Sequence, residues 1–130
     1  MKLIIKNLNI TFAPGAAKAA AEAPAKLEWS KTLLDGKCVN LADAEKAVAE
    51  LGEGWRLPTI DELLSIVDRT RHDPAIDTTR FPDTKSDCYW TSTPCAWDTS
   101  AVWIVSFYNG YVGSSRRNAG ACVRAVRSGQ

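Results

Sequence analysis

Residues 54–67, with the sequence GWRLPTIDELLSIV, carry the clearest fold signal in this chain. Thr59 and Glu62 have the T-x-x-E spacing of a capping box, in which each side chain accepts a hydrogen bond from the other residue's free backbone amide. Pro58 fixes the backbone just ahead of this cap. Apolar residues then follow at i, i+3, i+4 and i+7, on one helical face: Ile60, Leu63, Leu64 and Val67. The stretch predicts a helix that begins after Thr59 and packs on a core.

A second helix is predicted upstream of this stretch. Asn40 is a favourable N-cap residue, and Gly52 stands where a left-handed C-terminal cap is common. Between them, apolar residues recur along one helical face: Leu41, Ala44, Val48 and Leu51.

The C-terminal half predicts antiparallel strands. Residues 88–93 are rich in aromatic and β-branched side chains, and we expect Pro94 to end this strand. Asn109-Gly110 is a strong hairpin signal after a second strand. Alternation and size predict core positions on these two strands: Trp90, Trp103, Val105 and Phe107.

Residues 122–126 predict a short last strand. This strand carries Arg124 and Arg127, which are three positions apart, so we expect them to face opposite sides. One of them is expected to pair with a carboxylate of the capped helix, that of Asp61 or Glu62. The order of elements, with helices before a run of strands, indicates a segregated α+β domain.

The first 26 residues differ from the rest in composition. Residues 2–12 alternate from Leu8 onward, as a half-buried strand does. Residues 13–25 hold eight alanines and two prolines, without a large apolar side chain to dock a helix, and this indicates a linker or a short marginal helix. We therefore divide the chain into an N-terminal strand and Ala/Pro-rich linker, 1–26, and one domain, 27–130. Residues 2–12 either join the main sheet or serve as an attachment or homo-oligomerisation element.

Composition excludes several classes of function. The 130 residues suit one domain, and 16 Lys plus Arg against 15 Asp plus Glu give a formal net charge of +1. A nucleic-acid-binding protein usually shows a clear basic excess. No apolar stretch approaches the ~20 residues that span a bilayer, and the run near the N-terminus covers only Leu3 to Ile5, shorter than the about 7–15 residues of a secretory signal. We expect no nucleic-acid or membrane partner, and cytoplasmic synthesis.

The four cysteines allow two disulfides in three connectivities: Cys38, Cys88, Cys95 and Cys122. Without an export signal, reduced thiols are expected. In an oxidising environment, the spacing from Cys88 to Cys95 would allow a disulfide that clamps the loop after it. Zinc sites usually pair ligands as C-x₂₋₄-C, a spacing that is missing here, so we expect no metal and no cofactor.

Five motifs occur in order along the chain: GWRLPT leading into Glu62-Leu63, Phe81-Pro82, YWTST at 89–93, W-x-V-x-F-x-x-G at 103–110, and VRAVR at 123–127. Together, over Trp29 to Arg127, they resemble the Lcl C-terminal domain family. That family is similar to the C-type-lectin-like fold and to the formylglycine-generating-enzyme superfamily. The resemblance implies two helices packed on antiparallel strands, here with an extra N-terminal strand. It also implies a place in bacterial surface or phage proteins and a role in recognition.

Signatures of catalysis and of calcium-dependent sugar binding are missing from the sequence. His72 is the one histidine, and G-x-S-x-G, H-E-x-x-H and Gly-rich phosphate-loop motifs do not occur. Of the motifs that bind calcium in lectins, the sequence contains only the fragment Trp97-Asp98, and its one carboxylate supplies too few oxygens for the cation. We expect no catalytic residues, and binding without a metal.

The loops of the strand-rich half carry the candidate binding residues. Trp, Tyr, Ser, Asn and Arg side chains supply rigid amphipathic area and adaptable hydrogen bonds at interfaces. The candidates lie between Pro94 and Ser100 and between Tyr108 and Ala119: Trp97, Asp98, Tyr108, Asn109, Tyr111, Ser114, Ser115, Arg116, Arg117 and Asn118.

These residues predict a non-enzymatic recognition domain that binds a protein or glycan. The resemblance suggests a phage-encoded domain whose partner is a bacterial host surface or a host protein. Two uses stay open: a virion-associated receptor-binding module, or an intracellular inhibitor that docks on a host defence protein. The alternative from a different class is a small cysteine-dependent modifying enzyme.

Overall fold

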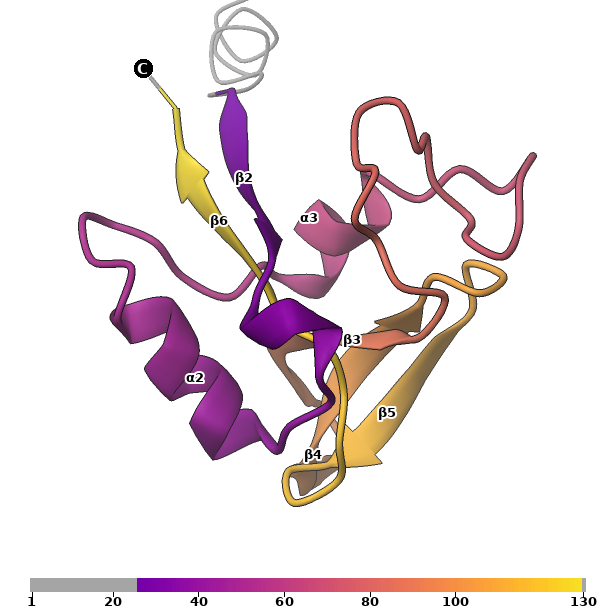
Figure 1. The fold of residues 1–130 in the computed structure, drawn as a ribbon. Coiled ribbons are helices and arrows are strands. Elements are labelled where there is room, and N and C mark those ends of the chain that lie inside the picture. The colour runs from indigo at the N-terminus through magenta and orange to yellow at the C-terminus, as the bar shows by residue number, and fades with distance from the viewer. Residues whose placement is uncertain (1–25, 130) are drawn as a thin grey trace, which may run out of the picture. The chain divides into compact units, whose positions relative to one another are not determined.

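Helix α2 spans Leu41–Ala49 in a computed structural model that describes residues 26–129 (Figure 1). The predicted cap is confirmed, because the Asn40 side chain accepts a hydrogen bond of 2.8 Å from the backbone amide of Asp43. Gly52 has the expected positive φ. Leu51 departs from the prediction: it lies beyond the end of the helix and is exposed.

Helix α3 spans Ile60–Leu64, and its capping box is complete. The Thr59 side chain accepts from the Glu62 amide, and the Glu62 carboxylate accepts from the Thr59 amide. Both oxygens of Glu62 also accept from the guanidinium of Arg56, at 2.6 and 2.8 Å. The helix is shorter than predicted, and Val67 packs against the core from beyond its end.

A three-stranded antiparallel sheet is formed by β3 (Cys88–Cys95), β4 (Asp98–Ser106) and β5 (Val112–Arg116), with β4 in the middle. The prediction that Pro94 ends the first strand is wrong. The proline lies inside β3 where the register shifts against β4, and a strand tolerates proline at such an irregularity.

The hairpin predicted at Asn109-Gly110 is confirmed between β4 and β5. Gly110 has a φ of 82°, which favours glycine, and its amide donates to the Ser106 carbonyl. The Asn109 side chain accepts from the amide of Tyr111. Local side-chain chemistry therefore fixes this turn, as the dipeptide indicates.

A second, two-stranded sheet pairs β2 (Leu27–Thr32) with β6 (Arg124–Ser128). The sequence did not predict β2, whose residues show no regular alternation of apolar and polar side chains. The last strand begins two residues later than predicted, since Cys122 forms an isolated bridge with Tyr89 instead.

Within the described residues, two α-helices and five strands in two small sheets form a mixed α+β fold, as predicted. Residues 28–127 make up one compact unit. The predicted strand at 2–12, its role in homo-oligomerisation, and the linker at 13–25 lie outside the described residues. Among residues 26–129, no helix has the length and apolar character needed to span a membrane.

The three-stranded sheet buries side chains on both of its faces. On one face, Trp90 and Val102 share a core cluster with Leu41, Ala44 and Val48 of α2. On the other, a second cluster joins α3 and the segment after it to the sheet: Leu63, Ile66, Tyr89, Val105 and Phe107. Each face of the sheet is thus covered by one helix.

Trp103 departs from its predicted place in the core. Trp90 and Phe107 are completely buried, but Trp103 is partly exposed and belongs to neither buried cluster. Trp103 lies on the same face as Val105 by alternation, farther along the strand.

The segment Ala121–Val126 runs through the middle of the unit, and none of its residues exposes more than 2% of its surface. Its backbone is bonded to four other parts of the chain. Ala121 exchanges two hydrogen bonds with Val39, and Val126 exchanges two with Arg56. The Cys122 carbonyl accepts from the Trp90 amide. This segment connects the two sheets.

The expectation that Arg124 or Arg127 pairs with Asp61 or Glu62 is wrong. The Glu62 carboxylate forms its ion pair with Arg56, as described above. Arg124 is buried and pairs with Asp83 at 3.2 Å, whereas Arg127 pairs with Glu28 and lies over the ring of Trp55. Glu28 lies on β2, the strand that pairs with β6, whereas Asp83 lies in the loop before β3.

Replacing Trp90 by alanine should lower the free energy of unfolding by about 3–5 kcal/mol, as for large aromatic truncations in cores. Its indole is fully buried and donates to the Val39 carbonyl at 2.7 Å. Trp103→Ala should cost less than half as much, because that side chain is partly exposed. Urea unfolding measures the free energy of unfolding of both variants. Equal losses would contradict the finding that Trp90 is buried and Trp103 is partly exposed.

Glu62→Gln should destabilise the protein more at pH 7 than at pH 3. The Arg56 guanidinium, together with the Thr59 amide, holds the pKa of Glu62 below its ordinary value. A carboxylate with a lowered folded pKa stabilises the fold above its unfolded pKa of about 4.3, and this contribution disappears as the pH falls through the folded pKa. At pH 7 we expect a loss of about 0.5–1 kcal/mol, measured by urea unfolding. A loss of the same size at pH 3 would show that the charge is not responsible.

Candidate binding surface

The predicted binding residues do not form one continuous face. Eight of the ten divide between the two ends of the three-stranded sheet, whose strands are drawn in Figure 1, and Ser114 and Ser115 lie within β5. β4 has nine residues, and at a rise of about 3.4 Å per residue its ends lie roughly 27 Å apart. Trp97, Asp98, Arg116, Arg117 and Asn118 belong to the end formed by the β3–β4 turn and the loop after β5.

The opposite end carries Tyr108, Asn109 and Tyr111 at the β4–β5 turn. The rings of Tyr108 and His72 meet edge to face, with centroids 6.4 Å apart. The backbone carbonyl of Tyr108 accepts a hydrogen bond from the amide of Asp73. Tyr111 is 71% exposed. At this end, backbone and ring contacts to the loop before β3 restrain the turn.

At the first end, Trp97 is 76% exposed, the highest value among the large hydrophobic side chains of the described residues. Its ring meets that of Trp103 edge to face, with centroids 5.4 Å apart and an interplanar angle of 85°. This is a favourable geometry for two aromatic rings. Trp103 therefore serves as a support that fixes the exposed indole.

Polar side chains surround this aromatic pair. Ser114 lies directly opposite Trp103 across β4 and β5, and Arg116 lies opposite Ala101 on the same face of the sheet. We call Trp97, Asp98, Trp103, Ser114 and Arg116 the Trp97 surface. Ser115 alternates to the other face, opposite Val102.

The turn that carries Trp97 is held in place by hydrogen bonds. The Asp98 carboxylate accepts from the amide and the hydroxyl of Ser100, at 3.1 and 2.6 Å. The Arg117 guanidinium donates twice to the Thr99 carbonyl and so ties the β3–β4 turn to the loop after β5. Asn118 is exposed on that loop.

The Trp97 surface also carries opposite charges. Hydrogen bonds from Ser100 lower the pKa of Asp98, and the charge of Arg116 lowers it further. The carboxylate is therefore ionised at neutral pH, next to a cationic guanidinium. The surface offers both an anionic acceptor and a cationic donor beside its exposed indole.

Alternation along β4 identified Trp103, but it suggested the core rather than this surface. In the sequence, the signal for its true position is the small polar Ser114 across the hairpin, where a core residue would have an apolar neighbour. Recognising this signal requires the register of the hairpin, which the dipeptide Asn109-Gly110 alone does not fix.

All four cysteines are free thiols. Cys88 and Cys95 are the first and last residues of the eight-residue strand β3. The distance between their α-carbons is therefore much longer than the 4.4–6.8 Å that a disulfide allows. The disulfide considered between them does not fit this strand. Cys38 and Cys122 instead lie close together, beside Asp87. Burial, followed by the charges of Cys38 and Asp87, raises the pKa of the Cys122 thiol to about 12.

A family model described as the Lcl C-terminal domain matches residues 18–127 of the chain. The resemblance drawn from the five sequence motifs is thereby confirmed. The match begins earlier than Trp29, where those motifs place the start. No curated protein matches the sequence.

Proposed function

The chain belongs to the Lcl C-terminal domain family, a lectin-like module, and on this premise we propose that it is a recognition domain with a C-type-lectin-like fold. The domain binds a glycan or protein ligand through the Trp97 surface and does not act as an enzyme. The observation that supports this proposal is the exposed indole of Trp97, held edge-on by Trp103.

An indole that is 76% exposed is unusual for a side chain of this size. Tryptophan is enriched among the residues that dominate binding energy at interfaces. Because Trp103 and the turn hydrogen bonds already fix the indole, it loses little conformational freedom when a ligand covers it. The surface is thus preorganised for an apolar contact.

The polar groups around the indole match either proposed ligand class. A sugar ring would place its apolar face on the exposed indole and its hydroxyls near Asp98, Ser114 and Arg116. A protein ligand would use the same indole as an anchor and pair with the two charges at its rim. In both cases the aromatic contact supplies affinity and the polar groups orient the ligand.

The proposed binding needs no calcium. Asp98 is the only carboxylate of the Trp97 surface, and it already accepts two hydrogen bonds from Ser100. Calcium takes 6–8 oxygen ligands, far more than this surface offers.

The proposed partner is a bacterial surface glycan or a host protein, and the proposed setting is a phage. A virion-associated receptor-binding module and an intracellular inhibitor of a host defence protein are the two uses in this setting. Both uses rest on the resemblance to proteins of bacterial surfaces and phages, and both employ the same surface.

Trp97→Ala should weaken ligand binding at least about tenfold, the loss typical of a residue that contributes more than 1.4 kcal/mol. Binding is measured on a bacterial glycan array and, in parallel, by titration of any glycan or host protein that the parent binds. The matched control is Tyr111→Ala, which removes another highly exposed aromatic ring: Tyr111 is a candidate from the sequence, but it lies at the other end of the sheet, outside the Trp97 surface. This control should bind like the parent.

The thermal unfolding of both variants should stay close to that of the parent, because neither ring is part of a buried cluster. Arg116→Ala should weaken binding in the same direction as Trp97→Ala. If Tyr111→Ala abolished binding and Trp97→Ala did not, the site would lie at the other end of the sheet and the proposal would be wrong.

A further inference from the structure

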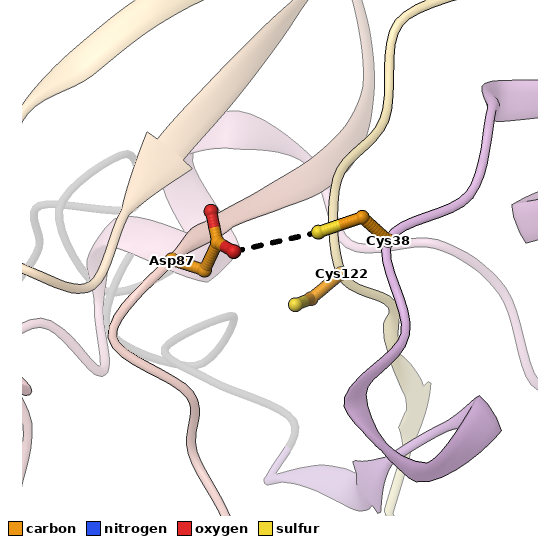
Figure 2. Close-up of side chains that lie close together, drawn as sticks. All are labelled: Cys38, Asp87 and Cys122. Carbon is orange, nitrogen blue, oxygen red and sulfur yellow. Dashed lines mark hydrogen bonds between the residues drawn. The ribbon is translucent and has the colours of Figure 1, made fainter.

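Three potential metal ligands from three separate segments meet at the start of β3. Figure 2 shows Cys38, from the loop before α2, beside Asp87, which precedes β3, and Cys122 of the buried central segment. Their ligand atoms all lie within 4.8 Å of one another. This place is at the opposite end of β3 from Trp97, so it is distinct from the proposed binding surface.

One spacing in this cluster is that of two ligands in a tetrahedral cation site. The Cys38 Sγ lies 3.4 Å from the Asp87 Oδ2. With Zn–S of ~2.3 Å and Zn–O of ~2.0 Å, two such ligands at a tetrahedral angle lie about 3.5 Å apart. The thiol and the carboxylate are already separated as they would be around one ion.

The backbone holds each ligand in position. Asp87 Oδ1 accepts from the amide of Cys88 at 2.7 Å, which leaves Oδ2 directed at Cys38. Cys122 donates its amide to the Cys88 carbonyl, and Cys38 adjoins the bridge between Val39 and Ala121. Carboxylates that bind a metal commonly accept a hydrogen bond of this kind, which fixes their orientation.

Burial gives the cluster a closed side and an open side. Cys122 is completely buried, whereas Cys38 and Asp87 are exposed. A cation can therefore enter from solvent past Cys38 and Asp87. The side toward solvent leaves room for a water molecule as a fourth ligand.

We propose that Cys38, Asp87 and Cys122 bind one zinc ion, with water in the fourth position. Two thiolates and one carboxylate form a donor set that suits this borderline-soft cation. Calcium and magnesium prefer oxygen ligands alone, and Cu(I) prefers sulfur without a hard carboxylate. Binding transfers the two thiol protons to solvent and needs no oxidant.

A disulfide between Cys38 and Cys122 is the competing fate of the two thiols. They are neighbours across the antiparallel bridge of Val39 with Ala121, where α-carbons come close enough for such a bond. The anchored carboxylate of Asp87 favours the cation, because it offers an oxygen ligand and a negative charge to a cation and has no role in a disulfide.

The test titrates the full chain, kept reduced by a phosphine, with Zn²⁺ by calorimetry and with Co²⁺ by absorbance. We expect one equivalent of either metal, a thiolate-to-cobalt charge-transfer band, and a higher melting temperature with zinc. Cys38→Ser and Asp87→Asn should each lower the zinc affinity at least about tenfold. Both side chains are exposed, so these variants should fold.

The matched control is Cys95→Ser, which removes the thiol at the far end of β3 and should leave zinc binding unchanged. Mass spectrometry of the titrated sample checks that Cys38 and Cys122 remain reduced. The proposal is overturned if the reduced parent binds no zinc, if Asp87→Asn binds it as tightly as the parent, or if Cys95→Ser loses it.

Discussion

The structure depends on one buried segment, Ala121–Val126, whose backbone is hydrogen-bonded to four separate parts of the chain. It bonds to Val39 before α2, to Trp90 on β3, to Leu33 after β2 and to Arg56 before α3. Buried backbone groups without partners are costly, so a segment with no access to water must satisfy them within the protein. These bonds are what bring the two small sheets and the two helices into one fold.

The same segment carries a buried charge, and this constrains what surrounds it. The Arg124 guanidinium donates to Ser30 and Thr32 of β2 and to Asp83 and Thr84 in the loop before β3. It also lies over the ring of Phe81 at 5.2 Å. A buried guanidinium is tolerated only with such partners, so the arginine fixes the position of this loop against β2.

The parts of the fold that the sequence predicted are those decided by near neighbours. The caps at Asn40 and Thr59 and the turn at Asn109-Gly110 involve residues only two or three positions apart. The pairing of β2 with β6 and the meeting of Cys38 with Cys122 each depend on residues more than eighty positions apart, and Arg124 pairs with Asp83 across 41 positions. Periodicity and spacing contain no information on such pairings. For the candidate surface, the sequence analysis proposed Trp97, Asp98, Ser114 and Arg116, but it placed Trp103 in the core and did not foresee that the candidates lie at two ends of the sheet.

Native-state hydrogen exchange tests most directly whether this segment holds the fold together. Four central amides should exchange only through global unfolding: those of Ala121, Cys122, Val126 and Trp90, the last of which donates to the Cys122 carbonyl. Their opening free energies should therefore equal the free energy of unfolding measured with urea. The loop amides at Thr70 and Thr79, which donate to the side chains of Asp68 and Asp77, should exchange through much smaller openings. If the central amides exchanged as readily as these loops while the rest of the core stayed protected, the segment would be peripheral to the stability of the fold and the account would be wrong.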